Sequence, residues 1–329
     1  MSLLSSIGER VAFVFPGQGS QYVGMGRAIY EASQAARRIF QQADEALGFS
    51  LTRLCFEGPE EELADTINAQ PAILTVSIAT LAALRERLNE LGKAISPIFV
   101  AGHSLGEITA LVAADVLEFT DAVRLARERG RLMKESGAER PGGMAAVIGL
   151  DEQSLSEIIR TAQARGIIVL ANTNSPEQSV LSGAREALAS AIELVRERGA
   201  RAVPLKISIA SHSPLMERAA AQFAEVVARI QLREPQVPIV AHIRGQLLQS
   251  ADDIRRELAE GLIRPVEWTR QVRQMVEGGV DTFIEIGPTN VLARLIERIN
   301  SNVRALSLAE RDFAALLAGL GGQPGERKT

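Results

Sequence analysis

The chain has 329 residues, of which 46% are hydrophobic and 23% charged, and this composition excludes a disordered or fibrous protein. Its length accommodates two domains, or one large domain that carries an insertion. The net charge of −4 provides no overall attraction for nucleic acid or an anionic membrane, and the single cysteine, Cys55, excludes an intrachain disulfide. Residues 1–10 lack the basic start and apolar core of a signal peptide, so we expect a cytoplasmic protein.

The first part of the chain alternates short apolar runs with helical patterns. Val11–Phe15 predicts a buried strand, and the turn-rich loop 16–21 follows it. Helical patterns come next, at about 27–47 and 72–91. Residues 97–101 predict a second buried strand, which runs into the segment 102–106, and a helical pattern begins at Glu107. Strands that alternate with helices predict a mostly parallel sheet with helices on both faces.

The stretch 66–84 carries no charge and is nearly long enough to span a bilayer. Polar residues interrupt it, and its apolar part amounts to about three to four helical turns, starting with Pro71 near the first helical position. We therefore interpret it as a helix buried in a protein core and expect no membrane association.

The middle of the chain has a different order of elements. Strand patterns occur at 144–150, 167–172, 179–182 and 202–207, with helical patterns at 152–164 and 185–198. The resulting order β-α-β-β-α-β is that of a ferredoxin-like unit. We interpret residues 141–207 as a ferredoxin-like subdomain inserted into a large α/β domain made of residues 1–140 and 208–318.

The α/β pattern returns after the predicted insertion. Helices are expected at about 215–230, 252–262, 266–278 and 290–299, and strands at 239–243 and 282–286. The tail 319–329 is polar and rich in glycine, so we expect it to be disordered.

A candidate nucleophile lies between the second predicted strand and the following helix. Gly102-x-Ser104-x-Gly106 has the strand–turn–helix setting of a nucleophile elbow, in which flanking glycines permit a sharp turn and the serine hydroxyl projects. The N-terminus of the helix presents backbone N–H groups that stabilise developing negative charge. The motif therefore predicts nucleophilic catalysis by Ser104.

Serine needs a base, and the chain offers three histidines. His103 directly precedes the serine, so its side chain is expected to point away and to pack or form a structural hydrogen bond. His212 lies in the loop that leaves the predicted insertion and could reach Ser104. His242 lies near the end of a predicted strand and could be structural. No Asp or Glu stands out as a third member, so backbone carbonyls could orient the base.

Taken together, the chain resembles the malonyl-CoA:acyl carrier protein transacylases and the related acyltransferase domains of polyketide synthases. The resemblance covers residues 11–300. It is carried, in the family's order, by Phe15-Pro16-Gly17-Gln18-Gly19-Ser20-Gln21, Gly102-His103-Ser104-Leu105-Gly106-Glu107, Arg129-Gly130-Arg131-Leu132-Met133, Ala171-Asn172-Thr173-Asn174-Ser175-Pro176, Ser211-His212-Ser213-Pro214-Leu215-Met216, Pro265-Val266-Glu267-Trp268-Thr269 and Glu285-Ile286-Gly287-Pro288. It implies a hydrolase-like α/β domain with a ferredoxin-like insertion.

The resemblance also implies roles for individual residues. Ser104 would carry the malonyl group as an ester, with His212 as the base. The backbone N–H groups of Gln18 and Leu105 would form the oxyanion hole, and Arg129 would bind the free carboxylate of malonate. Two further polar residues match positions around the family's site, Gln70 and Asn174. From the residues alone, Arg129 is one of four arginines in a predicted helix, most of which should face water.

The chain departs from the family at two places. The first concerns the group that orients the base, and the second concerns the residues before the histidine, which correlate with the choice of acyl group in polyketide acyltransferases. Many members have Gln four residues before the proline of Pro-Val-x-Trp, where this chain has Gly261, and the family uses the backbone carbonyl at that position to orient the histidine. The segment Ile209-Ala210-Ser211-His212 resembles the methylmalonyl form Tyr-Ala-Ser-His but lacks its tyrosine. The preference between malonyl and methylmalonyl groups therefore stays open.

The resemblance predicts a transferase that moves malonyl from malonyl-CoA to the phosphopantetheine thiol of an acyl carrier protein by a ping-pong mechanism. An acyl hydrolase acting on carrier-bound thioesters and a non-catalytic docking subunit of a synthase are the alternatives. We expect a monomer with no metal or other cofactor, and the pathway, fatty acid or polyketide, stays open. A basic surface for the acidic carrier protein is hypothesised at Arg131, Lys134, Arg264 and Arg270.

Overall fold

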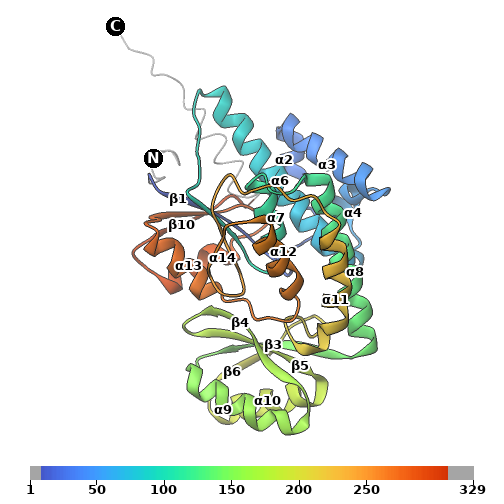
Figure 1. The fold of residues 1–329 in the computed structure, drawn as a ribbon, viewed down its shortest axis with the longest axis vertical. Coiled ribbons are helices and arrows are strands. Elements are labelled where there is room, and N and C mark those ends of the chain that lie inside the picture. Colours follow the sequence, from blue (N-terminus) through green and yellow to red (C-terminus); the bar gives the residue numbers. More distant parts are fainter. Residues whose placement is uncertain (1–8, 310–329) are drawn as a thin grey trace.

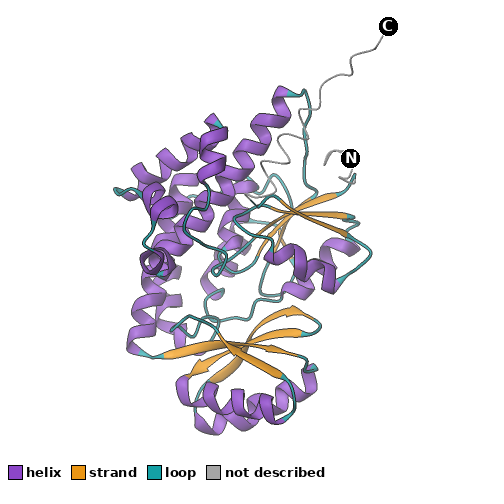
Figure 2. Cartoon of the chain, turned by 180° about the vertical axis from the view of Figure 1, so that it is seen from behind, coloured by secondary structure: helices purple, strands orange, loops and turns teal. Residues whose placement is uncertain are grey.

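The computed structural model describes residues 9–309, which form two β-sheets covered by helices (Figures 1 and 2). The larger sheet has the strand order β10-β9-β1-β2-β7-β8, and every neighbouring pair is parallel except β7 and β8. The prediction of a mostly parallel sheet is therefore confirmed. Its strands are β1 (Val11–Phe15), β2 (Phe99–Gly102), β7 (Ile239–Val240), β8 (Leu247–Leu248), β9 (Thr282–Glu285) and β10 (Arg304–Ser307).

Helices cover both faces of this sheet, which explains the continuous apolar run of β1. Val11, Phe13 and Phe15 pack in one hydrophobic cluster, and Ala12 and Val14 pack in another, because successive side chains of a strand point to opposite faces. The first cluster includes residues of α6 (Thr66–Glu90), α7 (Gly106–Ala113) and α8 (Phe119–Glu139). The second includes residues of α13 (Trp268–Glu277) and α14 (Val291–Ile299).

The helical pattern at 27–47 forms two helices, α2 (Arg27–Ala32) and α3 (Gln34–Leu47). Ser33 separates them because its backbone is extended and its side chain caps α3 by accepting the N–H of Ala36. The pattern from Glu107 is also divided, between α7 and α8, where Asp115 has a φ of 58°. The remaining helices of the large unit are α4 (Leu51–Glu57), α5 (Glu60–Ala64), α11 (Glu217–Ala228) and α12 (Ala251–Glu260), with a short 3₁₀ turn at Pro214–Met216. A second 3₁₀ turn, at Gln163–Arg165, belongs to the smaller unit.

The uncharged stretch forms helix α6, which is long and apolar enough to cross a membrane by length and composition. However, 83% of the most apolar 18-residue stretch of this helix is buried inside the protein. The prediction of a buried core helix is therefore confirmed. The predicted start at Pro71 is wrong. Asp65 caps the helix by accepting the N–H of Ile67, so the helix begins at Thr66 and contains Pro71. A proline this close to the N-terminus removes a single intrahelical hydrogen bond.

The smaller sheet has the order β4-β5-β3-β6, and all its pairs are antiparallel. Along the chain its elements are β3 (Gly142–Ile148), α9 (Glu152–Ala162), β4 (Ile168–Ser175), β5 (Gln178–Ala184), α10 (Arg185–Glu197) and β6 (Arg201–Pro204). The two helices cover the face that points away from the rest of the molecule (Figure 1). Strand β4 connects this sheet to the larger unit, since the Thr173 N–H donates to the Val266 carbonyl and the Val266 N–H to that of Ala171.

The remaining regions of the chain are two short strands and the C-terminal segment. The short strands β8 and β10 were not predicted, because runs of two and four residues without a clear apolar alternation give little signal. The predicted tail at 319–329 lies outside the described residues, as does the end of the predicted large domain after residue 309.

Candidate active site

Ser104 lies two residues after the end of β2, at the carboxyl edge of the parallel sheet. It has a φ of 53°, an unusual backbone conformation for a residue with a side chain. The turn requires the two glycines around it: a Cβ added to Gly102 would lie 1.9 Å from the backbone carbon of Gly106, and one added to Gly106 would lie 2.0 Å from the Phe15 oxygen. The structure therefore has the sharp strand–turn–helix geometry that the motif indicated.

His212 is the histidine that the fold brings to this serine. Its Nε2 lies 2.8 Å from Ser104 Oγ, and its Nδ1 lies 3.0 Å from the backbone oxygen of Arg264. A carbonyl oxygen can only accept, so Nδ1 carries the proton and Nε2 is left with its lone pair towards the serine hydroxyl. The backbone is also held, since the His212 N–H donates to the Leu262 oxygen at 2.9 Å and the residue has a φ of 58°.

The surroundings of His212 favour its neutral form. Burial is the largest cause that holds its pKa well below the usual value, and the charges of His242, Arg129 and His103 lower the pKa further. A neutral imidazole with a free Nε2 can accept the proton of a serine hydroxyl. The group that orients it is a backbone carbonyl, and no carboxylate contacts the His212 ring among residues 9–309.

The orienting carbonyl is not the predicted one. The resemblance assigned this role to position 261, but the acceptor for Nδ1 is the oxygen of Arg264, directly before Pro265. Gly261 instead lies at the end of α12 with its Cα against another histidine: a Cβ there would lie 2.8 Å from Cε1 of His242. The prediction is wrong because the chain turns after α12 and presents the later carbonyl to the ring.

His103 points away from the nucleophile, as the turn geometry predicts. Its Nε2 lies 2.9 Å from Oδ1 of Asn174 on β4, and its ring packs edge-on against Trp268 at 5.9 Å. Burial is the main reason that its pKa is lowered to about 4. Asn174 therefore reaches the site through His103 and connects the smaller sheet to the nucleophile turn.

Arg129 is buried, with only 4% of its surface exposed, and lies beside the serine. Its Nη2 donates to Ser104 Oγ at 3.1 Å, and its Nη1 donates to Oε1 of Gln70 at 2.8 Å. Burial lowers its pKa to about 10, partly offset by Glu107, so it stays cationic at neutral pH. Among the described residues it has no ion-pair partner.

Most arginines of this helix were expected to face water, and Arg129 is an exception. Arg124 and Arg131 have side chains 58% and 42% exposed and pair with acidic neighbours on α8. Arg129 lies four residues after Leu125 and four before Met133, both buried. This i, i+4 spacing with apolar residues places it on the buried face of α8, and it was the sequence signal that could have identified it.

A chain of side-chain hydrogen bonds joins Gln70 to the loop after β1. Gln70 Nε2 donates to Thr66 Oγ1 at 2.9 Å, and the Thr66 hydroxyl donates to Oε1 of Gln18 at 2.8 Å. Thr66 was not identified from the sequence, although it lies four residues before Gln70 on the same helix face. The chain connects Gln18, Thr66, Gln70 and Arg129 to Ser104.

The loop after β1 lies against the nucleophile turn. A Cβ added to Gly17 would lie 2.5 Å from the His103 oxygen, so only glycine permits this approach of the two backbones. Within residues 9–309, the backbone N–H groups of Gln18 and Leu105 donate to no protein acceptor. Leu105 immediately precedes α7, where N–H groups have no partner within the helix.

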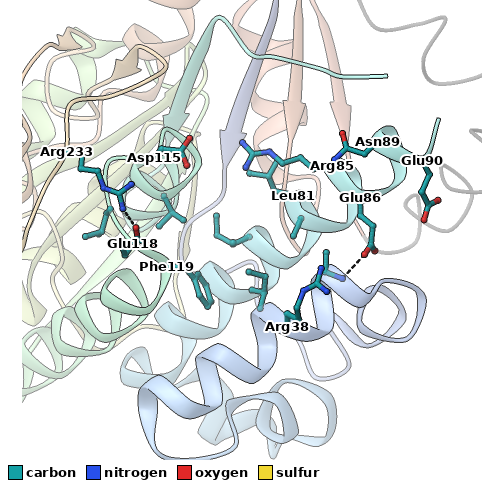
Figure 3. Close-up of a pocket in the computed structure, with 16 residues that line it drawn as sticks. Arg38, Leu81, Arg85, Glu86, Asn89, Glu90, Asp115, Glu118, Phe119 and Arg233 are labelled. Carbon is teal, nitrogen blue, oxygen red and sulfur yellow. Dashed lines mark hydrogen bonds and ion pairs between the residues drawn. The ribbon is translucent and has the colours of Figure 1, made fainter. Parts of the chain in front are cut away.

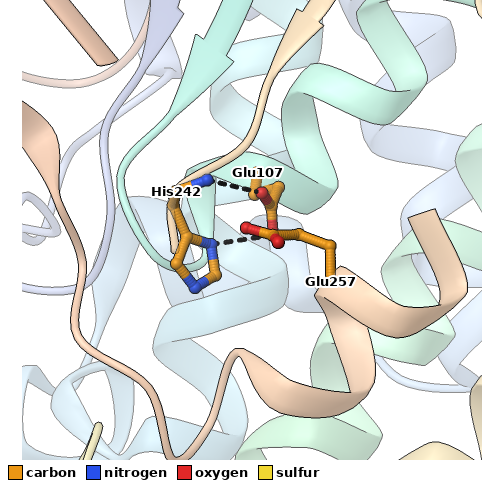
Figure 4. Close-up of side chains that lie close together, drawn as sticks. All are labelled: Glu107, His242 and Glu257. Carbon is orange, nitrogen blue, oxygen red and sulfur yellow. Dashed lines mark hydrogen bonds and ion pairs between the residues drawn. The ribbon is translucent and has the colours of Figure 1, made fainter. Parts of the chain in front are cut away.

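A buried cluster that sequence reasoning missed packs against His212 through the ring of His242. Figure 4 shows its three side chains. His242 Nδ1 lies 2.8 Å from Oε2 of Glu107, and Glu257 completes the only group of three metal-ligand side chains among the described residues. Because His242 and Glu107 are already in direct contact, we interpret the cluster as an ion pair with a neighbouring carboxyl group. The chain separation of these residues left no local pattern to detect.

Two cavities differ in their relation to this site. One of about 580 Å³ is lined by Gln18, Thr66, Lys134, Lys206 and Ile209, among others, and so opens beside the site. Another of about 550 Å³ lies between α3, α6 and α8 (Figure 3). Its walls contain Arg233 paired with Glu118, and none of the candidate catalytic residues lines it. We assign the second cavity no part in the reaction.

Comparison with known proteins agrees with this geometry. The acyl transferase domain family matches residues 12–312. The chain is 43% identical over 310 residues to the malonyl CoA-acyl carrier protein transacylase of Bacillus subtilis (strain 168), covering 94% of this chain and 96% of the relative. It is 41% identical over 300 residues to the transacylase of the same name from Escherichia coli (strain K12), covering 91% and 96%.

Solved structures show the same fold. The malonyl-CoA:acyl carrier protein transacylase of Xanthomonas oryzae pv. oryzae is 39% identical, with a TM-score of 0.88 and coverage of 95% of this chain and 98% of that one. A malonyl-transacylase in complex with its type II PKS acyl-carrier protein is also 39% identical, with a TM-score of 0.88 and coverage of 95% and 100%. The resemblance inferred from the motifs is thereby confirmed.

Proposed function

The chain belongs to the acyl transferase domain family, and from this membership and the geometry around Ser104 we propose that it transfers malonyl from malonyl-CoA to an acyl carrier protein. The observation that carries the proposal is Arg129. A buried guanidinium without an anionic partner, 3.1 Å from the nucleophile, is suited to a substrate that brings its own carboxylate. Malonyl thioesters have that carboxylate, and simple acyl thioesters do not.

The first half-reaction forms an ester on Ser104. His212 Nε2 takes the hydroxyl proton while Oγ attacks the thioester carbonyl of malonyl-CoA. The backbone N–H groups of Gln18 and Leu105 would stabilise the tetrahedral oxyanion, and their lack of a protein acceptor supports this role. The carbon–sulfur bond then breaks, and the coenzyme A thiolate takes the proton back from His212.

The second half-reaction uses the same groups in reverse. His212 takes the proton of the phosphopantetheine thiol of the carrier protein, the thiolate attacks the malonyl ester, and Ser104 regains its proton as the new thioester forms. A malonyl-enzyme intermediate separates the two halves, which is a ping-pong mechanism. In this mechanism His212 moves each proton, and backbone N–H groups stabilise the oxyanion. The mechanism as proposed therefore uses neither a metal nor another cofactor.

Three residues would hold the catalytic groups in place. Gln70 fixes one arm of Arg129, Asn174 holds His103 beneath the nucleophile turn, and Thr66 joins Gln70 to the oxyanion loop. Gln70 and Asn174 were predicted as substrate-binding residues. We propose that both act by positioning protein groups, because each has a protein partner within 2.9 Å.

We propose that the carrier protein approaches over the cavity beside the site. Lys134, Arg185 and Lys206 line this cavity, and neither Arg185 nor Lys206 has an ion-pair partner within residues 9–309. Of the four basic residues suggested by the sequence, three are paired with acidic neighbours: Arg131 with Glu128 and Glu135, Lys134 with Asp65, and Arg264 with Glu260. A solved relative that binds a type II PKS acyl-carrier protein supports a partner of this kind.

The finer classification of the fold is also a proposal. We propose that the larger unit is hydrolase-like, which a serine elbow at the carboxyl edge of a parallel sheet supports. The unit at 141–207 would be a ferredoxin-like insertion, supported by its β-α-β-β-α-β order and its antiparallel sheet. We further propose a cytoplasmic protein, which a single, buried cysteine without a disulfide supports. The expected monomeric state stays a prediction.

A mass measurement followed by a product assay tests the function. Brief exposure to malonyl-CoA should add one malonyl group, which peptide mapping should place on Ser104, and Ser104→Ala should abolish it. A full-stoichiometry adduct in that variant would show that another residue is the nucleophile. Transfer to carrier protein supports the transferase, release of free acid alone indicates a hydrolase, and neither product indicates a docking subunit.

A further inference from the structure

His242 lies behind the catalytic histidine and has no part in the mechanism above. Its ring centroid is 5.9 Å from that of His212, with the two ring planes at 80°. Only 2% of its surface is exposed, so this edge-on contact is made without intervening solvent. A histidine in this position can influence His212 through its charge and through the shape of the ring.

Glu107 holds His242 from two directions. Its Oε1 accepts the backbone N–H of His242 at 3.1 Å, and its Oε2 lies 2.8 Å from Nδ1. One backbone hydrogen bond and one close contact with Nδ1 suit a carboxylate, whose charge in turn stabilises an imidazolium. Figure 4 shows Glu257 beside this pair. Burial, followed by the charge of Glu107, raises the pKa of Glu257 to about 8, so Glu257 is mainly protonated at neutral pH and adds little negative charge.

Gly261 makes the space for the ring. A Cβ at this position would lie 2.8 Å from Cε1 of His242, which is too short for a stable contact, and 3.0 Å from Nε2, which is unusually tight. The backbone of Gly261 is helical, with a φ of −61°, so glycine is not required by conformation. The absence of a side chain at 261 is therefore explained by the presence of His242.

We propose that His242, held by Glu107 and seated in the space that Gly261 leaves open, is a positioning residue whose positive charge keeps His212 in its neutral, proton-accepting form. The proposal rests on the function assigned above, because it concerns the base of that reaction. Burial lowers the pKa of His242, but the charge and hydrogen bond of Glu107 outweigh it and raise the pKa overall, which supports the imidazolium.

The consequence is that the enzyme should stay active at lower pH. The groups that face His212 are Ser104 and His103 after β2, Arg129 on α8 and His242 after β7, while Glu107 on α7 and Glu257 on α12 face His242. A cation near His212 opposes protonation of its ring, so its pKa falls and the base stays available at lower pH. Removing the charge of His242 should raise the pKa of His212 and shift the acidic limb of the rate profile to higher pH.

The size of the shift follows from the separation of the rings. A unit charge about 6 Å away, at an effective dielectric constant of about 20, changes a pKa by roughly two units. The carboxylate of Glu107 offsets part of this effect, since it lies next to His242 with the opposite charge. We therefore expect a shift of about one pH unit in a variant that is neutral at position 242.

The first test is nuclear magnetic resonance of the full-length protein labelled with ¹⁵N-histidine. The chain has three histidines, so single substitutions assign the spectrum. At pH 7 we expect both ring nitrogens of His242 to carry protons, and His212 to be neutral with its proton on Nδ1. A neutral His242 at pH 7 would overturn the proposal, and this measurement needs no variant to be active.

The second test compares pre-steady-state acylation by malonyl-CoA from pH 4.5 to 8.5 in wild type and His242→Asn. We expect the acidic midpoint to rise by about one pH unit while the rate at pH 8 stays within about threefold. An unmoved midpoint with a uniformly lower rate would show that His242 acts through packing alone and would overturn the proposal. Absence of any adduct in the wild type would instead contradict the proposed function, whatever the spectrum shows.

Discussion

Replacing Arg129 by alanine should remove the selection for a carboxylated acyl group. In the structure the guanidinium is buried, fixed by Gln70 on one side, and 3.1 Å from Ser104 Oγ on the other. A malonyl carboxylate entering this site loses its hydration, which costs several kcal/mol unless a cation binds it. Acetyl-CoA has no such group, so it would leave Arg129 buried and unpaired.

The magnitude follows from the two arms of the guanidinium. Two charge-assisted hydrogen bonds at about 1.5–3 kcal/mol each give roughly 3–5 kcal/mol, after allowance for the bond that Arg129 already makes to the serine. This corresponds to a fall of roughly two to four powers of ten in kcat/KM for malonyl-CoA. Arg129→Lys should recover only part of the loss, because an ammonium group cannot form the bidentate pair.

The assay is the ratio of kcat/KM for malonyl-CoA to that for acetyl-CoA. Arg129 also contacts the nucleophile, so its removal can lower the absolute rates with both substrates. The ratio cancels this shared loss and reports only the effect of the substrate carboxylate. Arg124→Ala is the matched control, since Arg124 lies on the same helix with its side chain 58% exposed. A ratio that is the same in Arg129→Ala as in wild type would refute the assignment, provided that circular dichroism shows the variant folded.

Three further substitutions test the surroundings. His212→Ala should slow acylation by about three or more powers of ten, measured by quenched-flow mass spectrometry, and a rate near wild type would place the base elsewhere. Thr66→Val should lower kcat/KM about tenfold through loss of the hydroxyl bridge to Gln18, with Thr66→Ser close to wild type, and equal effects of the two would exclude the bridge. Gly261→Ala should reduce the free energy of unfolding by about 1–3 kcal/mol in wild type but raise it by about 0.4–1 kcal/mol in a His242→Ala background, measured with urea. Additive changes in that cycle would contradict the contact between the two positions.

Features that depend on neighbouring residues could be inferred from the sequence. The strand β1 was predicted with its observed bounds, because a run of five apolar β-type residues is buried wherever helices cover both faces of a sheet. The turn at Ser104 was predicted because glycines two residues before and after it leave room for a sharp reversal. The membership of the chain in its family was also visible in the order of its motifs.

The start of α6 shows how a local signal can mislead. Pro71 is compatible with the first turn of a helix, so it was interpreted as the start. The side chain of Asp65 begins the helix five residues earlier, because a hydrogen bond to a free N–H outweighs the single bond that the proline removes. Both signals are local, and the competition between them decided the boundary.

The partners of the catalytic groups were decided by tertiary structure. From the residues alone three histidines were candidates for the base, and only the resemblance pointed to His212. The fold supplies the physical contact, because it brings His212 to Ser104 although the two are 108 positions apart in the chain. The carbonyl that orients it lies 52 residues further on and belongs to Arg264, which no spacing rule indicates. Similarly, the apolar spacing around Arg129 indicates a buried helix face, but only the packing of α8 showed that this face brings the guanidinium to within 3.1 Å of Ser104 Oγ. Sequence patterns specify backbone geometry over a few residues, whereas hydrogen bonds and burial depend on groups that meet only when distant segments pack together.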